Sequence, residues 1–462
     1  MKSYTAPLRD FHFILHEFLN ITNENLANFK DYDVEFTQPL LSEAAKLAEG
    51  ALSETNVAGD QFGCKSIDGQ VSTPPGFKKA FNKIRDGGWP SLDCDTNYGG
   101  QGLPLIFSTV IGEIFSAANM ALTMYQGLTH GAYSAILAHG TEEQKKQYLP
   151  KMVSCEWTGT MNLTEPHCGT DLGLMTTKAV AQKDNSYKIS GEKIFISSGD
   201  HDLSSNIIHL VLAKIPGEED GLRGVSLFIV PKFLLDNQGT PTSKNNVSVG
   251  KLERKMGIKG NATCIMNYES ATGYLLGKKN QGLKAMFVMM NEARLGVGIQ
   301  GLAQAEAAFQ KALDYAKNRT QGRAINNNKD QKVADPILVH PDIKRNLMDQ
   351  KSFVEGGRAF SIWTALLLDR KKLSGNQEDG ELASLLTPVV KAYLTDIGYD
   401  MTIKAQQIFG GHGYIEDLGM SQISRDARIA MIYEGTNGIQ AIDLVGRKLL
   451  ANGGKSITLL FK

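Results

Sequence analysis

The stretch YKISGEKIFIS, residues Tyr187–Ser197, is rich in β-branched and aromatic residues and predicts a β-strand. Four further segments of similar composition, punctuated by Gly, Asp and Asn, lie around it: Trp157–Leu163, Asn206–Lys214, Gly224–Val230 and Cys264–Tyr268. Short strands at this spacing are typical of an antiparallel barrel or sandwich. The centre of the chain therefore predicts a small β domain.

Helical periodicity dominates on both sides of this β region. Before it, three segments have helical spacing or composition: 41–52, 107–122 and 132–149. After it, one helix face is marked by Leu295, Ile299, Leu302, Phe309 and Leu313. Further helices are expected around 342–373, 380–409 and 438–450. We therefore predict an α+β multi-domain protein: a helical domain (1–155), a β domain (156–275), a second helical domain (280–452) and a tail (453–462).

Composition excludes several classes of protein. The 462 residues include 49 basic and 49 acidic side chains, and this zero net charge argues against nucleic-acid binding and against an acidic disordered chain. No stretch reaches the roughly 18 apolar residues of a membrane-spanning helix, and the N-terminus lacks the apolar core of a signal peptide. The five cysteines form no C-x-x-C pair, so neither a disulfide framework nor a metal site is indicated. We expect a protein of the reducing cytoplasm.

One glycine motif has two interpretations. Gly296-Val297-Gly298-Ile299-Gln300-Gly301 matches the G-x-G-x-x-G pattern of dinucleotide-binding folds. That function requires a strand before the motif and a turn at its first glycine. Because the motif lies inside a long helical pattern, we expect its glycines to allow close packing between helices.

Three further segments have both a structural and a functional interpretation. Thr164–Asp171 follows a predicted strand, and its Pro166 and Gly169 favour either an ordinary turn or a cradle of N–H groups for a flavin ring or pyrophosphate. Gln407–Tyr414 either simply ends a helix with three glycines or lets a ligand approach the backbone. Arg319–Arg323 either complements a helix C-terminus or clamps a phosphate.

Tyr433–Gln440 precedes the last long helix. Thr436 or Asn437 suits the N-cap of that helix, which would make Glu434 a solvated loop acid. The alternative is that Glu434 is a general base on a glycine-hinged loop. Taken by itself, the segment favours the cap.

In their order along the chain, these segments resemble the acyl-CoA dehydrogenase family, and the resemblance spans nearly the whole sequence. The motifs that carry it are Thr164-Glu165-Pro166, Lys251–Gly260, Gln407–Gly411 and Ile432–Thr436. The larger bacterial members look closest, because they share the style of three segments: Tyr4–Pro7, Met289–Arg294 and Ile432–Gln440. Those members usually continue beyond the helical bundle, whereas this sequence ends at Lys462, so we expect a shorter C-terminal part.

The resemblance implies an N-terminal helical domain, a central antiparallel β-barrel and a C-terminal four-helix bundle. It also implies a homodimer or a dimer of dimers, with each FAD lying across a subunit interface. The residues expected to bind FAD are Met161, Leu163, Thr164, Thr170, Phe195, Ser197, Arg319, Gln321, Gln407, Gly410, Gly411 and Thr436. Phe195 and Ser197 stand where the family often has Trp and Thr, so an aromatic ring and a hydroxyl group are kept.

The resemblance further implies α,β-dehydrogenation of an acyl-CoA thioester to a trans-2-enoyl-CoA. Glu434 would remove the pro-R α-proton while the β-hydrogen leaves as hydride to flavin N5. The Glu434 N–H and a flavin ribityl hydroxyl would polarise the thioester carbonyl. Substrate contacts are expected from Thr170, Asn291, Arg294 and Gly435. Electron-transfer flavoprotein is the expected acceptor, and the alternatives are an oxygen-dependent acyl-CoA oxidase and a non-catalytic flavin-binding protein.

Overall fold

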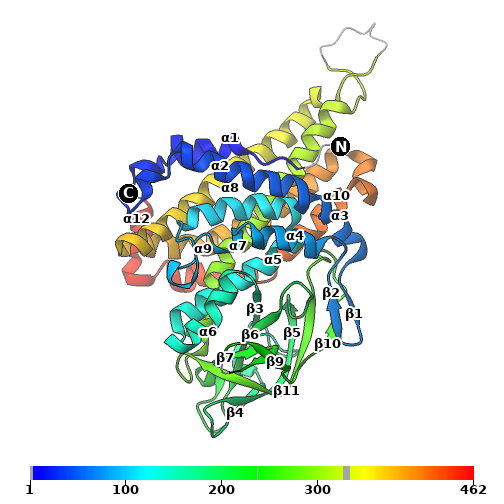
Figure 1. The fold of residues 1–462 in the computed structure, drawn as a ribbon. Coiled ribbons are helices and arrows are strands. Elements are labelled where there is room, and N and C mark those ends of the chain that lie inside the picture. Colours follow the sequence, from blue (N-terminus) through cyan, green and yellow to red (C-terminus); the bar gives the residue numbers. More distant parts are fainter. Residues whose placement is uncertain (1–3, 237, 326–332, 462) are drawn as a thin grey trace. The chain divides into compact units, whose positions relative to one another are not determined.

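The computed structural model describes residues 4–236, 238–325 and 333–461 (Figure 1). The chain divides into two compact units. Unit 1 comprises Met1–Val57, Pro104–Met120 and Arg294–Lys462, and unit 2 comprises Ala58–Leu103 and Ala121–Ala293. Two long helices, α5 (Leu105–His139) and α7 (Gly282–Asn318), each contribute residues to both units.

The other helices of the described residues are α1 (Leu8–His12), α2 (Val34–Leu47), α3 (Ser53–Phe62), α4 (Phe77–Asp86), α6 (Glu142–Val153), α8 (Pro341–Ser374), α9 (Gln377–Ile408), α10 (Met420–Ala427), α11 (Asn437–Asp443) and α12 (Lys455–Leu460). The strands are β1 (Lys65–Ile67), β2 (Gln70–Ser72), β3 (Trp157–Asn162), β4 (Lys178–Ala181), β5 (Tyr187–Ser197), β6 (Asn206–Lys214), β7 (Val225–Pro231), β8 (Phe233–Leu235), β9 (Pro241–Lys244), β10 (Val247–Leu252) and β11 (Thr263–Leu276). Helical N- and C-terminal parts thus flank a β region in the sequence, as predicted.

The main sheet of unit 2 has the strand order β10-β11-β5-β4-β6-β3, and β7 pairs with both β11 and β6. Most pairs are antiparallel, but β3 runs parallel to β6, from Trp157 opposite Asn206 to Asn162 opposite Val211. The expected β domain is therefore confirmed, but its sheet is antiparallel only in the main, and the described residues do not show the closed antiparallel barrel. A hairpin would force antiparallel pairing, but β4, β5 and their loops separate β3 from β6 in the chain, so either direction is open to them.

Apolar side chains cover the sheet in two clusters. Ile189 of β5, Val211 of β6 and Phe228 of β7 belong to one cluster and are fully buried. In the other cluster, Trp157 of β3 contacts Tyr148 of α6, with ring centroids 6.3 Å apart. All of β7, and β6 from Asn206 to Ala213, are buried, which explains their nearly continuous apolar sequence.

All five cysteines of the sequence lie in unit 2, and each is a free thiol. Burial raises the pKa of Cys155 and Cys264 to about 12 and that of Cys64 to about 11. These thiols are therefore protonated at neutral pH.

Helix α5 corrects two expectations from the sequence. It is long and apolar enough to cross a membrane, although no such stretch was expected, because its polar residues are mostly uncharged Ser, Thr and Asn. Of its apolar window, 83% is buried inside the protein, as in a core helix of a globular fold. The helix expected over 132–149 is in fact the end of α5 and the start of α6, because Thr141 and Gln144 form a capping box that begins a new helix.

A buried arginine joins four helices of unit 1. Arg358 of α8 donates from Nη2 to Glu113 Oε1 of α5 and Glu306 Oε2 of α7, each at 2.6 Å. Its Nη1 also donates to Asp10 Oδ2 of α1 at 3.1 Å. These contacts compensate a guanidinium that is completely shielded from water.

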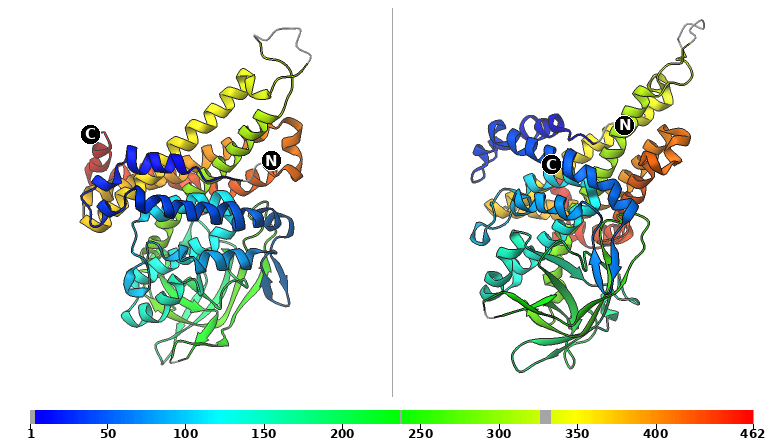
Figure 2. Two further views of the ribbon diagram at one scale, coloured as in Figure 1. Left: turned by 45° about the horizontal axis from the view of Figure 1, so that its top comes forward. Right: turned by 45° about the vertical axis from the view of Figure 1, so that its right-hand side comes forward.

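Helices α7 and α9 approach so closely that their glycine backbones contact each other. A Cβ placed on Gly301 would lie 2.6 Å from the carbonyl oxygen of Leu394, and one on Gly398 would lie 2.5 Å from that of Gly301. A Cβ on Gly298 would lie 3.0 Å from the Val390 oxygen. The G-x-G-x-x-G motif therefore serves helix packing, as predicted. Figure 2 shows α9 (orange-yellow) with its hairpin partner α8 (yellow), to which it is joined through Gly375 and Asn376.

Gly301→Ala should lower the free energy of unfolding by about 1–3 kcal/mol, because the added methyl group overpacks the α7–α9 contact. Gly296→Ala is the matched control, since a Cβ there would meet no atom within 4 Å. The control should be neutral or stabilising by up to about 1 kcal/mol, from helix propensity alone. Thermal and urea unfolding would check both, and equal stability of the two variants would contradict the packing role.

Candidate active site

Glu434 lies on a loop of unit 1 whose backbone is left-handed at two consecutive residues. The φ angle is 57° at Glu434 and 82° at Gly435. This region suits glycine but is uncommon for a glutamate, and such strain persists only where neighbouring contacts impose it. The loop ends at Thr436, whose Oγ1 accepts a hydrogen bond from the Ile439 N–H and caps α11. The cap interpretation of Thr436 is therefore confirmed.

Lys391 of α9 holds this loop in place. Its Nζ donates to the carbonyl oxygen of Gly435 at 2.8 Å and to Asn437 Oδ1 at 2.7 Å. The side-chain amide of Asn437 in turn donates to Thr395 Oγ1 at 2.9 Å and to Asp396 Oδ1 at 2.6 Å, both on α9. The backbone after Glu434 is thus tied to one helix by a chain of hydrogen bonds.

Two further side chains hold the loop from its other sides. Gln440 Nε2 donates to the carbonyl oxygens of Glu434 and Gly435, at 3.2 and 3.0 Å. The hydroxyl of Tyr433 donates to Gln300 Oε1 on α7. These contacts supply the constraint that a left-handed glutamate requires.

The Glu434 carboxyl is poised to change charge near neutral pH. Burial raises its pKa to about 7, against the opposing influence of Lys391 and Arg294. Burial also lowers the pKa of Lys391 to about 8, while Glu434 and Asp396 favour its charged form. A carboxylate with such a pKa is a far better proton acceptor than a solvated loop acid, and the partial burial of Glu434 speaks against the solvated interpretation.

The expected substrate residues on α7 fall in different units. Arg294 is buried in unit 1, and its Nη1 forms an ion pair with Asp443 Oδ2 of α11 at 2.8 Å. Asn291 is exposed and belongs to unit 2. Of the expected substrate residues, the structure therefore brings together Arg294 and Gly435, around the Glu434 loop.

Five of the expected FAD residues lie on β3, directly after β3 and on β5, in unit 2. The carbonyl oxygen of Thr164 accepts a hydrogen bond from the Ile194 N–H at 2.9 Å, which joins the end of β3 to β5. Phe195, next to that bond, is 61% exposed and has a left-handed φ of 59°. Ser197 follows on β5, while Met161 and Leu163 are half-buried on the β3 side. Together these residues offer an exposed aromatic ring, two half-buried apolar side chains and hydroxyl groups.

The turn after β3 contains an ion pair that was not singled out from the sequence. Glu165 and Cys168 exchange backbone hydrogen bonds at 2.8 and 3.0 Å, which confirms a tight turn. Glu165 is buried and pairs with Lys193 of β5 at 2.8 Å. Burial opposes ionisation, but Lys193 and Thr177 hold the pKa of Glu165 at about 2. Thr170 is exposed beyond this turn. Lys193 shares the alternating register of the buried residues Tyr187 and Ile189, and a lysine at such an inward position is the signal that could have revealed the pair.

The expected FAD residues near the ends of α7 and α9 lie in unit 1. Gln407, Gly410 and Gly411 are exposed at the end of α9, and Arg319 and Gln321 are exposed after α7. An aromatic contact ties the two helix ends together: the Tyr315 ring stacks on Phe409 with centroids 4.2 Å apart, and its hydroxyl hydrogen-bonds His412 Nδ1 at 2.9 Å. Thr436 completes the set in this unit as the α11 cap.

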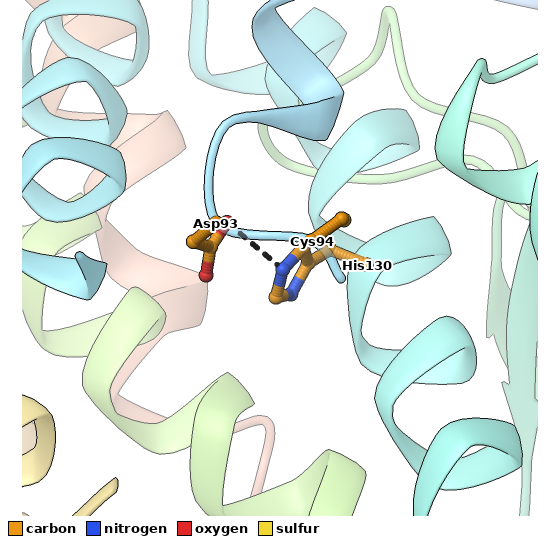
Figure 3. Close-up of side chains that lie close together, drawn as sticks. All are labelled: Asp93, Cys94 and His130. Carbon is orange, nitrogen blue, oxygen red and sulfur yellow. Dashed lines mark ion pairs between the residues drawn. The ribbon is translucent and has the colours of Figure 1, made fainter. Parts of the chain in front are cut away.

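Asp93, Cys94 and His130 form a cluster in unit 2 whose ligand atoms all lie within 4.8 Å of one another (Figure 3). Such spacing could hold a metal ion. However, His130 Nε2 faces Asp93 Oδ1 at 3.1 Å, and Nδ1 faces Glu292 Oε2 at 3.3 Å. Burial disfavours the charged ring, but the two carboxylates raise the pKa of His130 well above its usual value. A doubly paired imidazolium accounts for this arrangement. A second group of this kind is Glu165, His167 and Cys168, in which Glu165 is engaged by Lys193.

Family comparison agrees with this division of the chain. Residues 66–156 match the N-terminal domain of acyl-CoA dehydrogenases, residues 160–271 the middle domain and residues 280–450 the C-terminal domain. The chain therefore belongs to the acyl-CoA dehydrogenase family.

Individual relatives support this assignment. The chain is 40% identical to 3-methylmercaptopropionyl-CoA dehydrogenase of Ruegeria pomeroyi, over 98% of this chain and 78% of the relative. Among solved structures, it resembles an acyl-CoA dehydrogenase complexed with FAD from Bacillus anthracis, with 25% identity, a TM-score of 0.72 and coverage of 91% and 69%. It also resembles a structure described as electron transferring flavoprotein of Acidaminococcus fermentans, with 26% identity, a TM-score of 0.71 and coverage of 90% and 98%.

The raised pKa of Glu434 predicts a specific dependence of stability on pH. The folded chain binds this proton more tightly than the unfolded chain, so the contribution is complete below about pH 4.5 and is lost as the pH rises through about 7. Glu434→Gln removes the titration, so the wild type should lose thermal stability relative to this variant from about pH 5 to pH 8. Glu416→Gln, at an exposed acid, should run parallel to the wild type. Parallel curves for Glu434→Gln as well would show that the carboxyl titrates normally.

Proposed function

We propose that this protein is an FAD-dependent acyl-CoA dehydrogenase that converts an acyl-CoA thioester to a trans-2-enoyl-CoA, with Glu434 as the base. The observation that carries the proposal is the Glu434 carboxyl itself, which is held on a strained loop and has a pKa of about 7. Family membership and the FAD-complexed relative support the same reaction.

The expected FAD residues on β5 and on or after β3 in unit 2 fit a flavin chemically. A flavin has a planar aromatic ring with a polar rim, so it needs apolar and aromatic contacts together with hydrogen-bond donors. Phe195 presents an exposed ring there, and Met161 and Leu163 present apolar side chains. Thr164 and Ser197 supply hydroxyl groups. We assign these five residues, with Thr170, to FAD binding.

The remaining expected FAD residues form a second set in unit 1. Gly410 and Gly411 meet no atom within 4 Å at their Cβ positions, so a ligand could approach their backbone closely. We propose that Arg319, Gln321, Gln407 and these two glycines bind the cofactor of a neighbouring subunit in a homodimer or homotetramer, and that Thr436 approaches the diphosphate. The exposure of these side chains supports a role outside their own core.

The residues of this chain divide the reaction between proton removal and positioning. Ionised Glu434 takes the proton from the carbon next to the thioester carbonyl. When bound, FAD supplies the acceptor for the hydride that leaves the β-carbon. Burial of Glu434 brings its pKa close to the working pH, which favours proton transfer. We assign substrate contacts to Thr170, Asn291, Arg294 and Gly435.

Several finer features belong to the same proposal. We propose domains over 1–155, 156–275 and 280–452, supported by the three family matches. A barrel-like closure of the middle domain is supported by the pairing of β7 with both β11 and β6, and a four-helix bundle by the long helices α7, α8 and α9 with α11. A cytoplasmic location is supported by the five free thiols. Electron-transfer flavoprotein is the proposed acceptor, supported by the similar chain in the Acidaminococcus fermentans structure.

The reaction can be tested by anaerobic flavin bleaching with acyl-CoAs of graded length, including a thioether acyl group. Glu434→Gln should keep its flavin spectrum but bleach about 10²–10⁴-fold more slowly, because a general base is lost. The wild-type rate should rise with pH through about 7, as Glu434 ionises.

Glu43→Gln, at an exposed acid of α2, is the matched control and should bleach like the wild type. Bleaching of Glu434→Gln at the wild-type rate would rule out this base. Stoichiometric peroxide formed with enoyl-CoA in air would instead identify an acyl-CoA oxidase. A flavin that no acyl-CoA bleaches would leave a flavin-binding protein without this activity.

A further inference from the structure

We propose that Lys391 is a positioning residue for the reaction: it fixes the backbone on which Glu434 stands and brings a positive charge to that loop. This inference rests on the proposed function. It concerns a side chain that lies 43 positions before Glu434 in the sequence and touches the loop only through the fold.

The position of Lys391 suits this role. Its side chain is fully buried on α9, and Nζ reaches both the Gly435 carbonyl and the Asn437 amide oxygen. These two acceptors follow Glu434 directly, on either side of the α11 cap residue Thr436. Lys391 therefore holds the loop where its backbone leaves the left-handed conformation.

The hydrogen-bond partners of Lys391 are neutral, which distinguishes it from an ordinary buried ion pair. A buried ammonium group is costly unless a carboxylate compensates it. Here the compensating carboxylates act without being the hydrogen-bond acceptors: they are Glu434 on the loop and Asp396 on α9. Arg294 on α7 is the third charged group that faces this centre. A buried lysine that served stability alone would be expected to bond a carboxylate directly, because neutral oxygens such as those of Gly435 and Asn437 cannot balance its charge.

The arrangement has two separable consequences for Glu434. The positive charge of Lys391 lowers the pKa of the carboxyl and so increases its ionised fraction at neutral pH. The hydrogen bonds to the loop maintain its strained backbone and so the direction of the carboxyl group. Loss of the Lys391 charge should shift the pH dependence of the reaction rate, whereas loss of a hydrogen bond to the loop alone should not.

The experiment compares Lys391→Met, Lys391→Arg and Asn437→Ala in the FAD-loaded protein. Lys391→Met should raise the midpoint of the acidic limb of the bleaching rate by about one pH unit, which lowers the rate at pH 7 about fivefold. Lys391→Arg should restore most of the lost rate, because it keeps a charge and donors. Asn437→Ala should slow bleaching without moving the limb, because it removes a tether but leaves the lysine charged.

A second readout is independent of turnover. Hydrogen–deuterium exchange of the segment 432–440, measured by mass spectrometry, should be accelerated at least about tenfold by Lys391→Met, because the loop loses its anchor to α9. Lys311→Met is the matched control: Lys311 is a half-buried lysine of α7 whose pKa is also lowered by burial. It should change neither the pH limb nor exchange in this segment.

The outcomes separate this inference from the proposed function. If the wild type bleaches with acyl-CoA but Lys391→Met matches it in both pH limb and exchange, the role of Lys391 is overturned while the function stands. If Lys391→Met unfolds, the test rests on Asn437→Ala. A shift in the pH dependence of its bleaching rate would overturn the claim that the charge of Lys391 and its hydrogen bonds to the loop act separately. A wild type that never bleaches would overturn the function, and the positioning role with it.

Discussion

The close approach of α7 and α9 is the constraint on which the Glu434 site depends. At Gly301 and Gly398 the two backbones meet with no side chain between them. Gln300, which binds Tyr433, is next to Gly301 on α7, and Lys391, which binds the Gly435 carbonyl, follows Val390, whose backbone packs against Gly298. A wider helix spacing would pull these two anchors apart, and the left-handed backbone at Glu434 would relax. A motif that resembles a nucleotide-binding loop therefore supports the site through packing.

Unit 1 buries charge in two different ways. Around Arg358, the carboxylates of Glu113 and Glu306 contact the guanidinium directly, at 2.6 Å each, and join the helices. Around Glu434, the nearby cation donates its hydrogen bonds to backbone and amide oxygens instead. Burial raises the pKa of both Glu113 and Glu434 to about 7, so the two acids differ in their hydrogen-bond partners and not in this value. The Glu113 carboxylate is engaged by Arg358 and joins helices, whereas the cation next to Glu434 is bonded to the loop backbone instead.

The sequence predicts what local patterns control. The bounds expected for β5 and β6 match the structure, because β-branched and aromatic residues run through both and turn residues flank them. The cap at Thr436 is also readable from one short segment, whereas the role expected of Glu434 comes from the resemblance of the whole chain to a family. β4 and β10 were missed, since Lys178–Ala181 and Val247–Leu252 are short and largely exposed. The parallel pairing of β3 with β6 and the contact of Lys391 with the loop depend on residues far apart in sequence, which no periodicity records.

The placement of the cysteines gives this protein an internal reporter of local opening. Reagents that react with thiolates attack slowly when a thiol is buried and its pKa is raised, as it is for Cys155 and Cys264. The sequence segments of unit 1 contain no cysteine. The kinetics of cysteine alkylation would therefore report local opening of unit 2 alone. A spectroscopic unfolding signal averages over both units. Comparing its unfolding rate with the rate of thiol alkylation would therefore show whether the two units unfold together or in succession.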